Sequence, residues 1–96
     1  MPEFPGGMQE LYAYLQKKTE YPQQARELGI QGITLVQFVV DRYGAVGKVT
    51  VEVSSHPLLD KEAVRVVRSL PKWVPGKING KPVACYYRLP IVFELR

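Results

Sequence analysis

The feature that most constrains this 96-residue chain is the alternation of side chains over residues 83–95. Every odd position in this segment is apolar, whereas the even positions include arginine, glutamate, tyrosine and proline. A period of two is that of a β-strand with one packed face, so we predict a strand over Val83–Leu95. Pro90 lies inside it and cannot donate a hydrogen bond to a neighbouring strand. The strand is therefore predicted at a sheet edge, with the backbone groups of its even residues pointing outward.

Two helices are predicted ahead of the first strand. Apolar residues recur at intervals of three and four over Met8–Lys18, which is the spacing of an amphipathic helix. A shorter helix is predicted to open at Tyr21-Pro22, because proline is well suited to the first helical position. Gly29 is expected to end this helix, with Ala25 and Leu28 facing inward.

The middle of the chain predicts a β-hairpin followed by a third helix. Ile33–Asp41 is rich in β-branched residues at both parities, so we expect a central strand with both faces mostly covered. Val46–Ser54 alternates as its hairpin partner, and an apolar stripe predicts a helix over Asp60–Ser69. Pro71–Lys81 is expected to be a connector anchored by Trp73. The order α, α, β, β, α, β predicts an α+β domain, with a small three-stranded antiparallel sheet and helices packed on one face.

Composition indicates one ordinary folded domain. Residues 1–7 are rich in proline and glycine and are expected to be an extended lead-in, which leaves residues 8–96 as the domain. The formal charge is +4, and from Lys61 onward there are eight basic and two acidic residues. No apolar run reaches the ~18 residues that a membrane span requires. The single cysteine, Cys85, excludes an internal disulfide and a cysteine-rich zinc site.

Neither an enzyme nor a metal protein is predicted. His56 and Cys85 are the conventional candidates for a base and a nucleophile. His56 lies in a Ser-Ser-His-Pro turn, and Cys85 falls on the packed parity of the last strand, so both are interpreted as structural. No ligand set for a metal is apparent, and no cofactor is expected. A nucleic-acid module is a rival hypothesis because the C-terminal third is basic and tyrosine-containing, but Gly44-Ala45-Val46-Gly47 lies between two strands, unlike the GxxG loop of KH domains.

Several short motifs carry a family resemblance. In chain order they are Tyr21-Pro22, Gly32, the Val36-Phe38-Val40 alternation, Gly44, Leu59-Asp60 with Ala63, Trp73-Val74-Pro75-Gly76-Lys77 and Asn79-Gly80-Lys81-Pro82. Together they resemble the C-terminal domain of TonB-type energy transducers, from about Tyr21 to Leu95. The lead-in and the first helix resemble an elongated variant of that domain.

The resemblance implies a periplasmic domain of a protein anchored in the inner membrane. An N-terminal membrane anchor and a proline-rich linker would lie outside this chain, which would then be a C-terminal fragment. The anchor would work with a proton-driven motor complex of ExbB and ExbD type. The domain itself would grip the Ton box of an outer-membrane TonB-dependent transporter and would catalyse no reaction.

The last strand is the predicted docking edge. β-Augmentation uses such edges, with main-chain hydrogen bonds providing affinity and side chains providing selectivity. Carried over by position, the resemblance places the peptide along Ala84, Cys85, Tyr86, Tyr87, Arg88 and Leu89, with Tyr21 and Pro22 at the end of the family's Gln-Pro-x-Tyr-Pro motif. Lys18, Thr19 and Glu20 depart from the start of that motif, so its glutamine contacts do not carry over. An exposed edge also favours pairing between two copies, and a homodimer is a further expectation.

Two other kinds of function are compatible with this sequence. A TolA-like periplasmic connector, or the interaction domain of a membrane-bound sensor, would employ this fold for a different partner. A nucleic-acid-binding module would instead use the basic C-terminal third, with Tyr43, Tyr86 and Tyr87 available for stacking.

Overall fold

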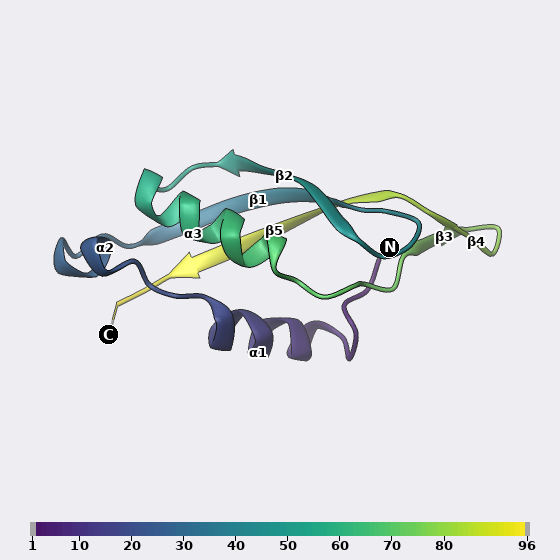
Figure 1. Ribbon diagram of the computed structural model, residues 1–96, viewed down its shortest axis with the longest axis horizontal. Helices are drawn as coiled ribbons and strands as arrows, with labels where there is room; N and C mark the ends of the chain where they lie inside the picture. Colours follow the sequence, from purple (N-terminus) through teal and green to yellow (C-terminus); the bar gives the residue numbers. More distant parts are fainter. Residues whose placement is uncertain (1, 96) are drawn as a thin grey trace.

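The computed structural model describes residues 2–95, and Met1 and Arg96, the ends of the expected lead-in and domain, lie outside the described residues. The molecule is elongated, with extents of 49 × 23 × 15 Å (Figure 1). Its elements are α1 (Met8–Lys18), α2 (Gln23–Glu27), β1 (Gly32–Val40), β2 (Val46–Val53), α3 (Pro57–Arg68), β3 (Gly76–Ile78), β4 (Lys81–Val83) and β5 (Cys85–Phe93). Among residues 2–95, no helix is both long and apolar enough to cross a bilayer.

The main sheet is three-stranded and antiparallel, in the order β2-β1-β5. β1 pairs with β5 over nine consecutive residues, from Gly32 opposite Phe93 to Val40 opposite Cys85. The prediction of a central strand followed by a hairpin partner is confirmed, as is the edge position of the last strand.

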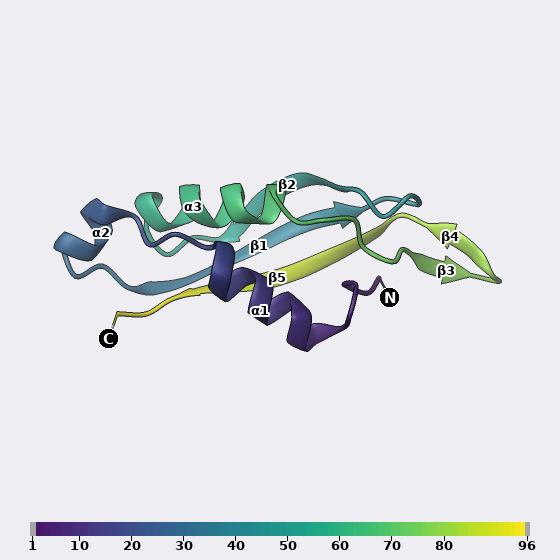
Figure 2. The same ribbon diagram turned by 60° about the horizontal axis from the view of Figure 1, so that its bottom comes forward.

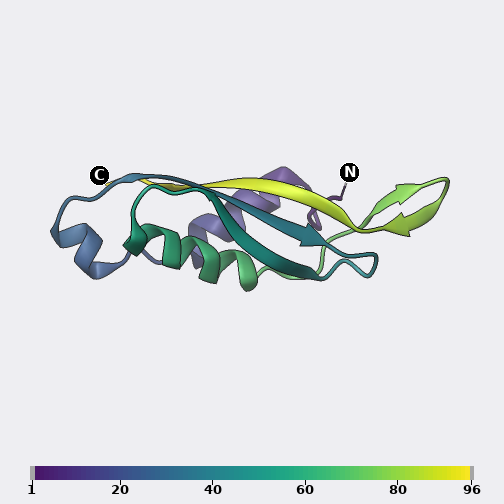
Figure 3. The same ribbon diagram turned by 90° about the horizontal axis from the view of Figure 1, so that it is seen from above.

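α2 and α3 lie on one side of this sheet, and α1 extends from that side to the level of β5 (Figure 3). From Thr34 to Val40 the even residues of β1 face the helices and are fully buried, including Val36 and Phe38. The odd residues face the bare side, where Ile33 of β1 is 55% exposed and Val92, its partner on β5, is 57% exposed. The α+β fold with helices on one face is confirmed. The expectation that both faces of β1 are mostly covered is wrong, because no second layer formed by residues 2–95 covers the odd face.

α1 has the predicted bounds, but α2 and α3 differ from prediction in detail. α2 begins after Pro22, which occupies the N-cap position, and Gly29 follows it with a φ of +69°. Ala25 is buried as expected, but Leu28 is 65% exposed and its predicted inward position is wrong. A helix this short presents only one turn to the core, and Ala25 already occupies that contact.

α3 begins one turn earlier than the apolar stripe indicated. His56 is its N-cap, and the His56 Nδ1 accepts a hydrogen bond from the Leu58 amide at 3.1 Å. Pro57 is the first helical residue, where its missing N–H leaves no partner unsatisfied.

The predicted connector contains a second, two-stranded sheet. β3 and β4 pair around Asn79-Gly80, whose φ angles of 51° and 77° are both positive, as a tight type I′ hairpin requires. This hairpin projects beyond the end of the main sheet (Figure 3). Val83 therefore belongs to β4, and β5 starts two residues later than predicted.

The N-terminal segment packs onto the domain instead of preceding it. Pro2 and Phe4 are buried, and Glu3 forms an antiparallel bridge with Val74. The Phe4 ring lies 5.5 Å from Trp73, centroid to centroid. Trp73 is 3% exposed, so it anchors the connector in the core as expected.

Gly44 allows the β1–β2 turn to approach this connector closely. Its φ is +85°, and its carbonyl accepts a hydrogen bond from the Trp73 amide at 2.8 Å. A Cβ at this position would lie 2.0 Å from the Trp73 carbonyl oxygen. Only glycine fits here, because both the backbone conformation and the space exclude a side chain.

A hydrogen-bond network around Asp60 joins α3 to β1 and the end of β2. The Asp60 carboxylate accepts hydrogen bonds from the Thr34 hydroxyl at 2.8 Å, the Ser55 amide at 3.1 Å and the Ser54 hydroxyl. Burial opposes ionisation of Asp60, but these bonds outweigh it and hold the pKa of its carboxyl below the ordinary 3.8.

We predict that Gly44→Ala lowers the free energy of unfolding by more than about 2 kcal/mol, since backbone strain adds to a clash with Trp73. Gly29→Ala is the matched control, because Gly29 has a similar φ but nothing within 4 Å of the added Cβ. It should cost only about 1–2 kcal/mol. Urea unfolding followed by tryptophan fluorescence measures both, and equal losses would contradict the close approach.

Asp60 should make the stability depend on pH. A lowered folded-state pKa means that its contribution is present above the unfolded pKa near 3.8 and is lost as the pH falls through the folded value. Asp60→Ala should cost about 1–3 kcal/mol at pH 7. Wild-type stability should fall more steeply than that of the variant between about pH 5 and pH 3. Parallel pH profiles in urea titrations would show that the network carries no such charge dependence.

Candidate functional site

The outer edge of β5 has an open row of backbone groups. β5 has one strand neighbour, β1, and pairs with it without a register shift over nine residues. The opposite edge is different: the pairing of β2 with β1 has two register shifts, and Lys48 adopts a φ of 49°. Bulges and irregular residues of this kind protect an edge against further pairing. β5 is therefore the edge that is regular enough to receive another strand.

The parity of the outward groups follows from Pro90 and Leu95. Along an antiparallel edge, one parity directs its N–H and C=O to the inner neighbour and the other directs them outward. The Leu95 amide donates to Gln31 Oε1 at 2.7 Å, on the inner side next to β1. The backbone N–H and C=O groups of the odd residues therefore point toward β1. Those of the even residues, which include Pro90, point outward. Tyr86, Arg88 and Val92 supply the outward donors, with a gap at Pro90.

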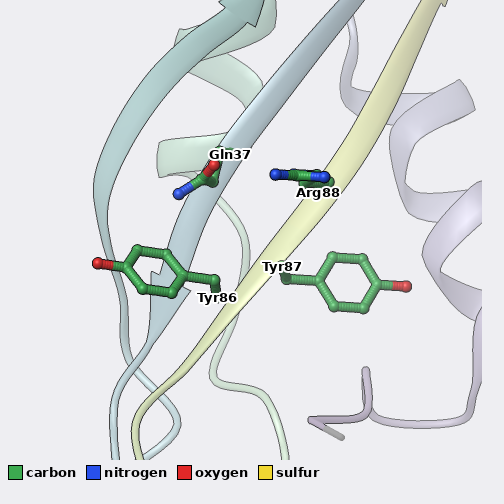
Figure 4. A pocket seen from close by; sticks show the side chains of 4 residues that line it. All are labelled: Gln37, Tyr86, Tyr87 and Arg88. Atoms are coloured by element: carbon green, nitrogen blue, oxygen red, sulfur yellow. The ribbon is translucent and has the colours of Figure 1, made fainter.

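The side chains at the start of β5 border a hollow on the bare face. It has a volume of about 530 Å³ and is lined by Gln37, Tyr86, Tyr87 and Arg88. Figure 4 shows Tyr86 and Tyr87 leaving the strand in opposite directions, with Tyr87 extending toward α1. Tyr86 is 69% exposed, so its ring is available to a partner.

Arg88 forms an ion pair across the bare face. Its Nε lies 3.0 Å from Glu52 Oε2 on β2, with Gln37 of the intervening strand β1 paired to Arg88. The Arg88 side chain is 65% exposed and that of Glu52 is 31% exposed. A pair this open to water contributes little to stability, so Arg88 can exchange Glu52 for another acceptor at small cost.

Tyr87 has a structural position instead. Its ring lies 4.9 Å from Trp73 and 5.6 Å from Phe38, and its hydroxyl contacts Met8 Sδ at 3.4 Å. Burial raises the pKa of the Tyr87 phenol above its ordinary value of 10. Cys85 and Leu89 share this packed parity. Of the predicted docking segment, Ala84, Tyr86 and Arg88 therefore present exposed side chains, whereas Cys85, Tyr87 and Leu89 pack on the helix side and direct their backbone groups to β1.

Tyr21 lies at the other end of the strand. Its ring packs edge-on against Phe93 with centroids 5.7 Å apart, and its hydroxyl donates to the Ile30 carbonyl. At ~3.3 Å per residue, Phe93 is roughly 23 Å along β5 from Tyr86. The structure thus places Tyr21 and Pro22 beside β5 but does not bring them together with Ala84 and Tyr86.

A buried acidic residue of α3 fixes the α1–α2 link next to this end of β5. Glu62 is 8% exposed, and its Oε2 accepts a hydrogen bond from the Glu20 amide at 2.6 Å. Arg65 pairs with Glu62 and donates to the Lys18 carbonyl at 3.0 Å. The bond to Glu62 raises the pKa of Arg65 above its ordinary value. α1 is therefore held at a set position beside the sheet.

A groove that the sequence did not predict lies between α1 and the second half of β5. It has a volume of about 510 Å³, and we call it the α1 groove. Figure 2 shows α1 crossing β5 at an angle. Its lining residues are Tyr12, Leu15, Gln16, Thr19, Tyr21, Arg26, Pro90, Ile91, Val92, Phe93 and Glu94. Periodicity predicts α1 itself, but its placement beside the edge depends on tertiary contacts.

The structure separates the two conventional catalytic candidates. His56 caps α3 next to the start of β1, and Cys85 pairs with Val40 at the end of β1. Nine strand residues set them about 26 Å apart, so they do not form a nucleophile–base pair. Within residues 2–95, no group of three acidic, histidine or cysteine residues is placed to hold a metal ion. Gly44 and Ala45 lie in the β1–β2 turn, and Val46 and Gly47 begin β2, so this segment does not lie between helices.

Comparison with known proteins gives a consistent match. A family model described as Gram-negative bacterial TonB protein C-terminal matches residues 17–95. The fold is similar to the NMR solution structure of Helicobacter pylori TonB-CTD (residues 194–285), with a TM-score of 0.68, 22% identity and 90% of each chain covered. A longer form of that domain (residues 179–285) also has a TM-score of 0.68, with 23% identity over 96% of this chain and 87% of the other. No curated protein sequence matches.

Because the Arg88–Glu52 pair is exposed, we predict that Arg88→Ala and Glu52→Ala each change the free energy of unfolding by less than about 1 kcal/mol. The double variant should differ from the sum of the two by about 0.5 kcal/mol or less. Urea denaturation of the four proteins measures this cycle. A coupling of several kcal/mol would instead make Arg88 a structural residue and exclude a free role at the edge.

Proposed function

The chain belongs to the family of Gram-negative bacterial TonB C-terminal domains, and from this premise we propose that it captures the Ton box of an outer-membrane transporter on the free edge of β5. The captured peptide adds a strand to the sheet beside Ala84–Leu89. The domain lies in the periplasm and belongs to a protein anchored in the inner membrane. It passes on the energy of a proton-driven complex of ExbB and ExbD type for substrate uptake.

The observation that carries this proposal is the difference between the two sheet edges. Most proteins blunt both edges, because a long regular edge invites unwanted pairing. Here β2 has two register shifts, whereas β5 keeps nine regular pairs with β1 and exposes its outer side. Strand capture requires a regular edge strand with free backbone groups, and of the two edges β5 is the regular one.

The expected affinity is modest. Each main-chain hydrogen bond contributes a net of about 0.5–1.5 kcal/mol, and the peptide also loses conformational freedom when it is ordered. Pro90 removes one donor from the outward row, so bonding is continuous only from Ala84 to Leu89. Such an interface forms and releases readily, as a transient coupling needs.

Charge favours an acidic or neutral partner. Between Glu62 and Glu94 the sequence has no acidic residue but six basic ones, and Arg88 lies on the edge itself. A surface of one sign raises the encounter rate with a partner of opposite sign, and salt weakens this effect. The same edge also supports pairing with a second copy, so a homodimer competes with the peptide for β5.

We predict that Arg88→Pro weakens binding of a Ton-box peptide at least tenfold. The substitution removes an outward N–H and places a ring where the added strand would lie, while the bonds to β1 stay intact. Isothermal titration of the peptide into the protein measures the dissociation constant. NMR shifts of the labelled protein should be largest for residues 84–89, and largest shifts on β2 would contradict the proposal.

Arg88→Ala is the matched control, because it removes the same side chain but keeps the backbone N–H. It should weaken binding much less than Arg88→Pro does. If both variants lose affinity for the peptide to the same extent, the interaction depends on the Arg88 side chain and not on strand addition. If random RNA binds in a salt-sensitive way and the peptide does not, the domain is a nucleic-acid module instead.

A further inference from the structure

The α1 groove has two walls of different origin. One side of α1 presents residues spaced by three and four positions, which include Tyr12 and Gln16. The opposite wall is residues 90–94 of β5 and the chain beyond it. Tyr12 is 55% exposed, so the α1 wall of the groove is open to a ligand. Charged lining side chains occur only at Arg26 and Glu94, and the other lining residues are apolar or neutral.

A strand added to β5 would direct side chains into this groove. Successive side chains of a strand point to opposite faces of the sheet, with a period of two. On the bare face, every second side chain would meet Tyr86, Arg88 or water. The intervening side chains would point to the helix side, where α1 lies next to the edge. The position of α1 thus gives the two faces of a captured peptide different surroundings.

We propose that the α1 groove is a specificity site that selects an extended peptide with uncharged, apolar side chains at every second position. This inference rests on the proposed capture of a peptide by β5 and extends the contact beyond residue 89 to Pro90–Glu94. Main-chain bonding is weakest there, because Pro90 has no donor. Side-chain burial in the groove compensates for the missing bond. A carboxylate placed there would lose hydration, and Arg26 is the single basic side chain among the lining residues.

The occupant is a peptide strand of the partner and not a small molecule. The groove is lined by five consecutive residues, 90–94, at and beyond the end of β5, the strand at the free edge that receives the peptide. Its volume of about 510 Å³ corresponds to a few side chains of valine or leucine size. It is lined by both parities of β5, from Pro90 to Glu94, as a site that borders the edge must be.

An aspartate scan of a bound peptide tests the proposal. The probe is a ten-residue synthetic peptide carrying the Ton box of a transporter from the same organism, followed by fluorescence anisotropy. Aspartate at every second position of the part that reaches residues 90–94 should weaken binding at least tenfold. Aspartate at the intervening positions should change it less than threefold. An even loss at all positions would overturn the proposal.

Variants of α1 provide the second arm. Tyr12→Ala should weaken binding of the unmodified peptide three- to tenfold, because it removes part of the α1 wall of the groove. Tyr43→Ala is the matched control, because Tyr43 is also an exposed tyrosine (67%) but lies on the distant β1–β2 turn. Its loss should change peptide binding less than twofold. Gln16→Lys should restore at least part of the affinity of the peptide with aspartate at a groove position, because it adds a basic partner on α1, in addition to Arg26. Equal effects of Tyr12→Ala and Tyr43→Ala on binding, or no rescue by Gln16→Lys, would refute the α1 groove as a specificity site.

The outcomes separate this inference from the proposed function. If the peptide binds, and Arg88→Pro abolishes binding, but the aspartate scan shows no alternation, then strand capture stands and the α1 groove has no part in it. If no Ton-box peptide binds the wild-type protein at all, the proposed function fails and the specificity site fails with it.

Discussion

The pairing of β5 with β1 is the constraint on which the rest of the molecule depends. Nine residues pair without a shift, so the odd side chains of β5 all face the helices and the even ones face water. A slip of one residue would exchange these two sets and expose Leu89, Ile91 and Phe93. The same register also decides which backbone groups remain free. The register of β5 on β1 therefore determines both the packing of the core and the position of the free backbone groups at the edge.

Much of this arrangement could be predicted from local patterns. The alternation over residues 83–95 and the position of Pro90 predict an edge strand, because period and missing donor are both local properties. The apolar spacing over Met8–Lys18 predicts α1 for the same reason. The projecting β3–β4 hairpin lies in the segment that the sequence predicts as a connector. Asn79-Gly80 is a strong hairpin signal, but strands of only three residues each show no clear alternation.

The remaining differences come from contacts between distant parts of the chain. Leu28 has the spacing of a core residue, but α2 is too short to turn it inward. The lead-in has a linker-like composition, yet Phe4 packs against Trp73, which is 69 residues away in the sequence (73 − 4). The α1 groove depends in the same way on the Glu62 and Arg65 bonds that fix the end of α1. Sequence periodicity determines which face of a helix is apolar but not where the helix lies beside the sheet.

The long axis of the molecule has a mechanical consequence. β5 runs roughly along that axis (Figure 1). Its outward hydrogen-bonding groups point across it, because hydrogen bonds between antiparallel strands are perpendicular to the strands. A strand bound to this edge and pulled along its own direction would load all of its hydrogen bonds at once, in shear. The same strand pulled sideways would lose them one at a time, as a zip opens. An elongated domain with its free edge parallel to its length therefore resists tension in one direction and releases its partner easily in another.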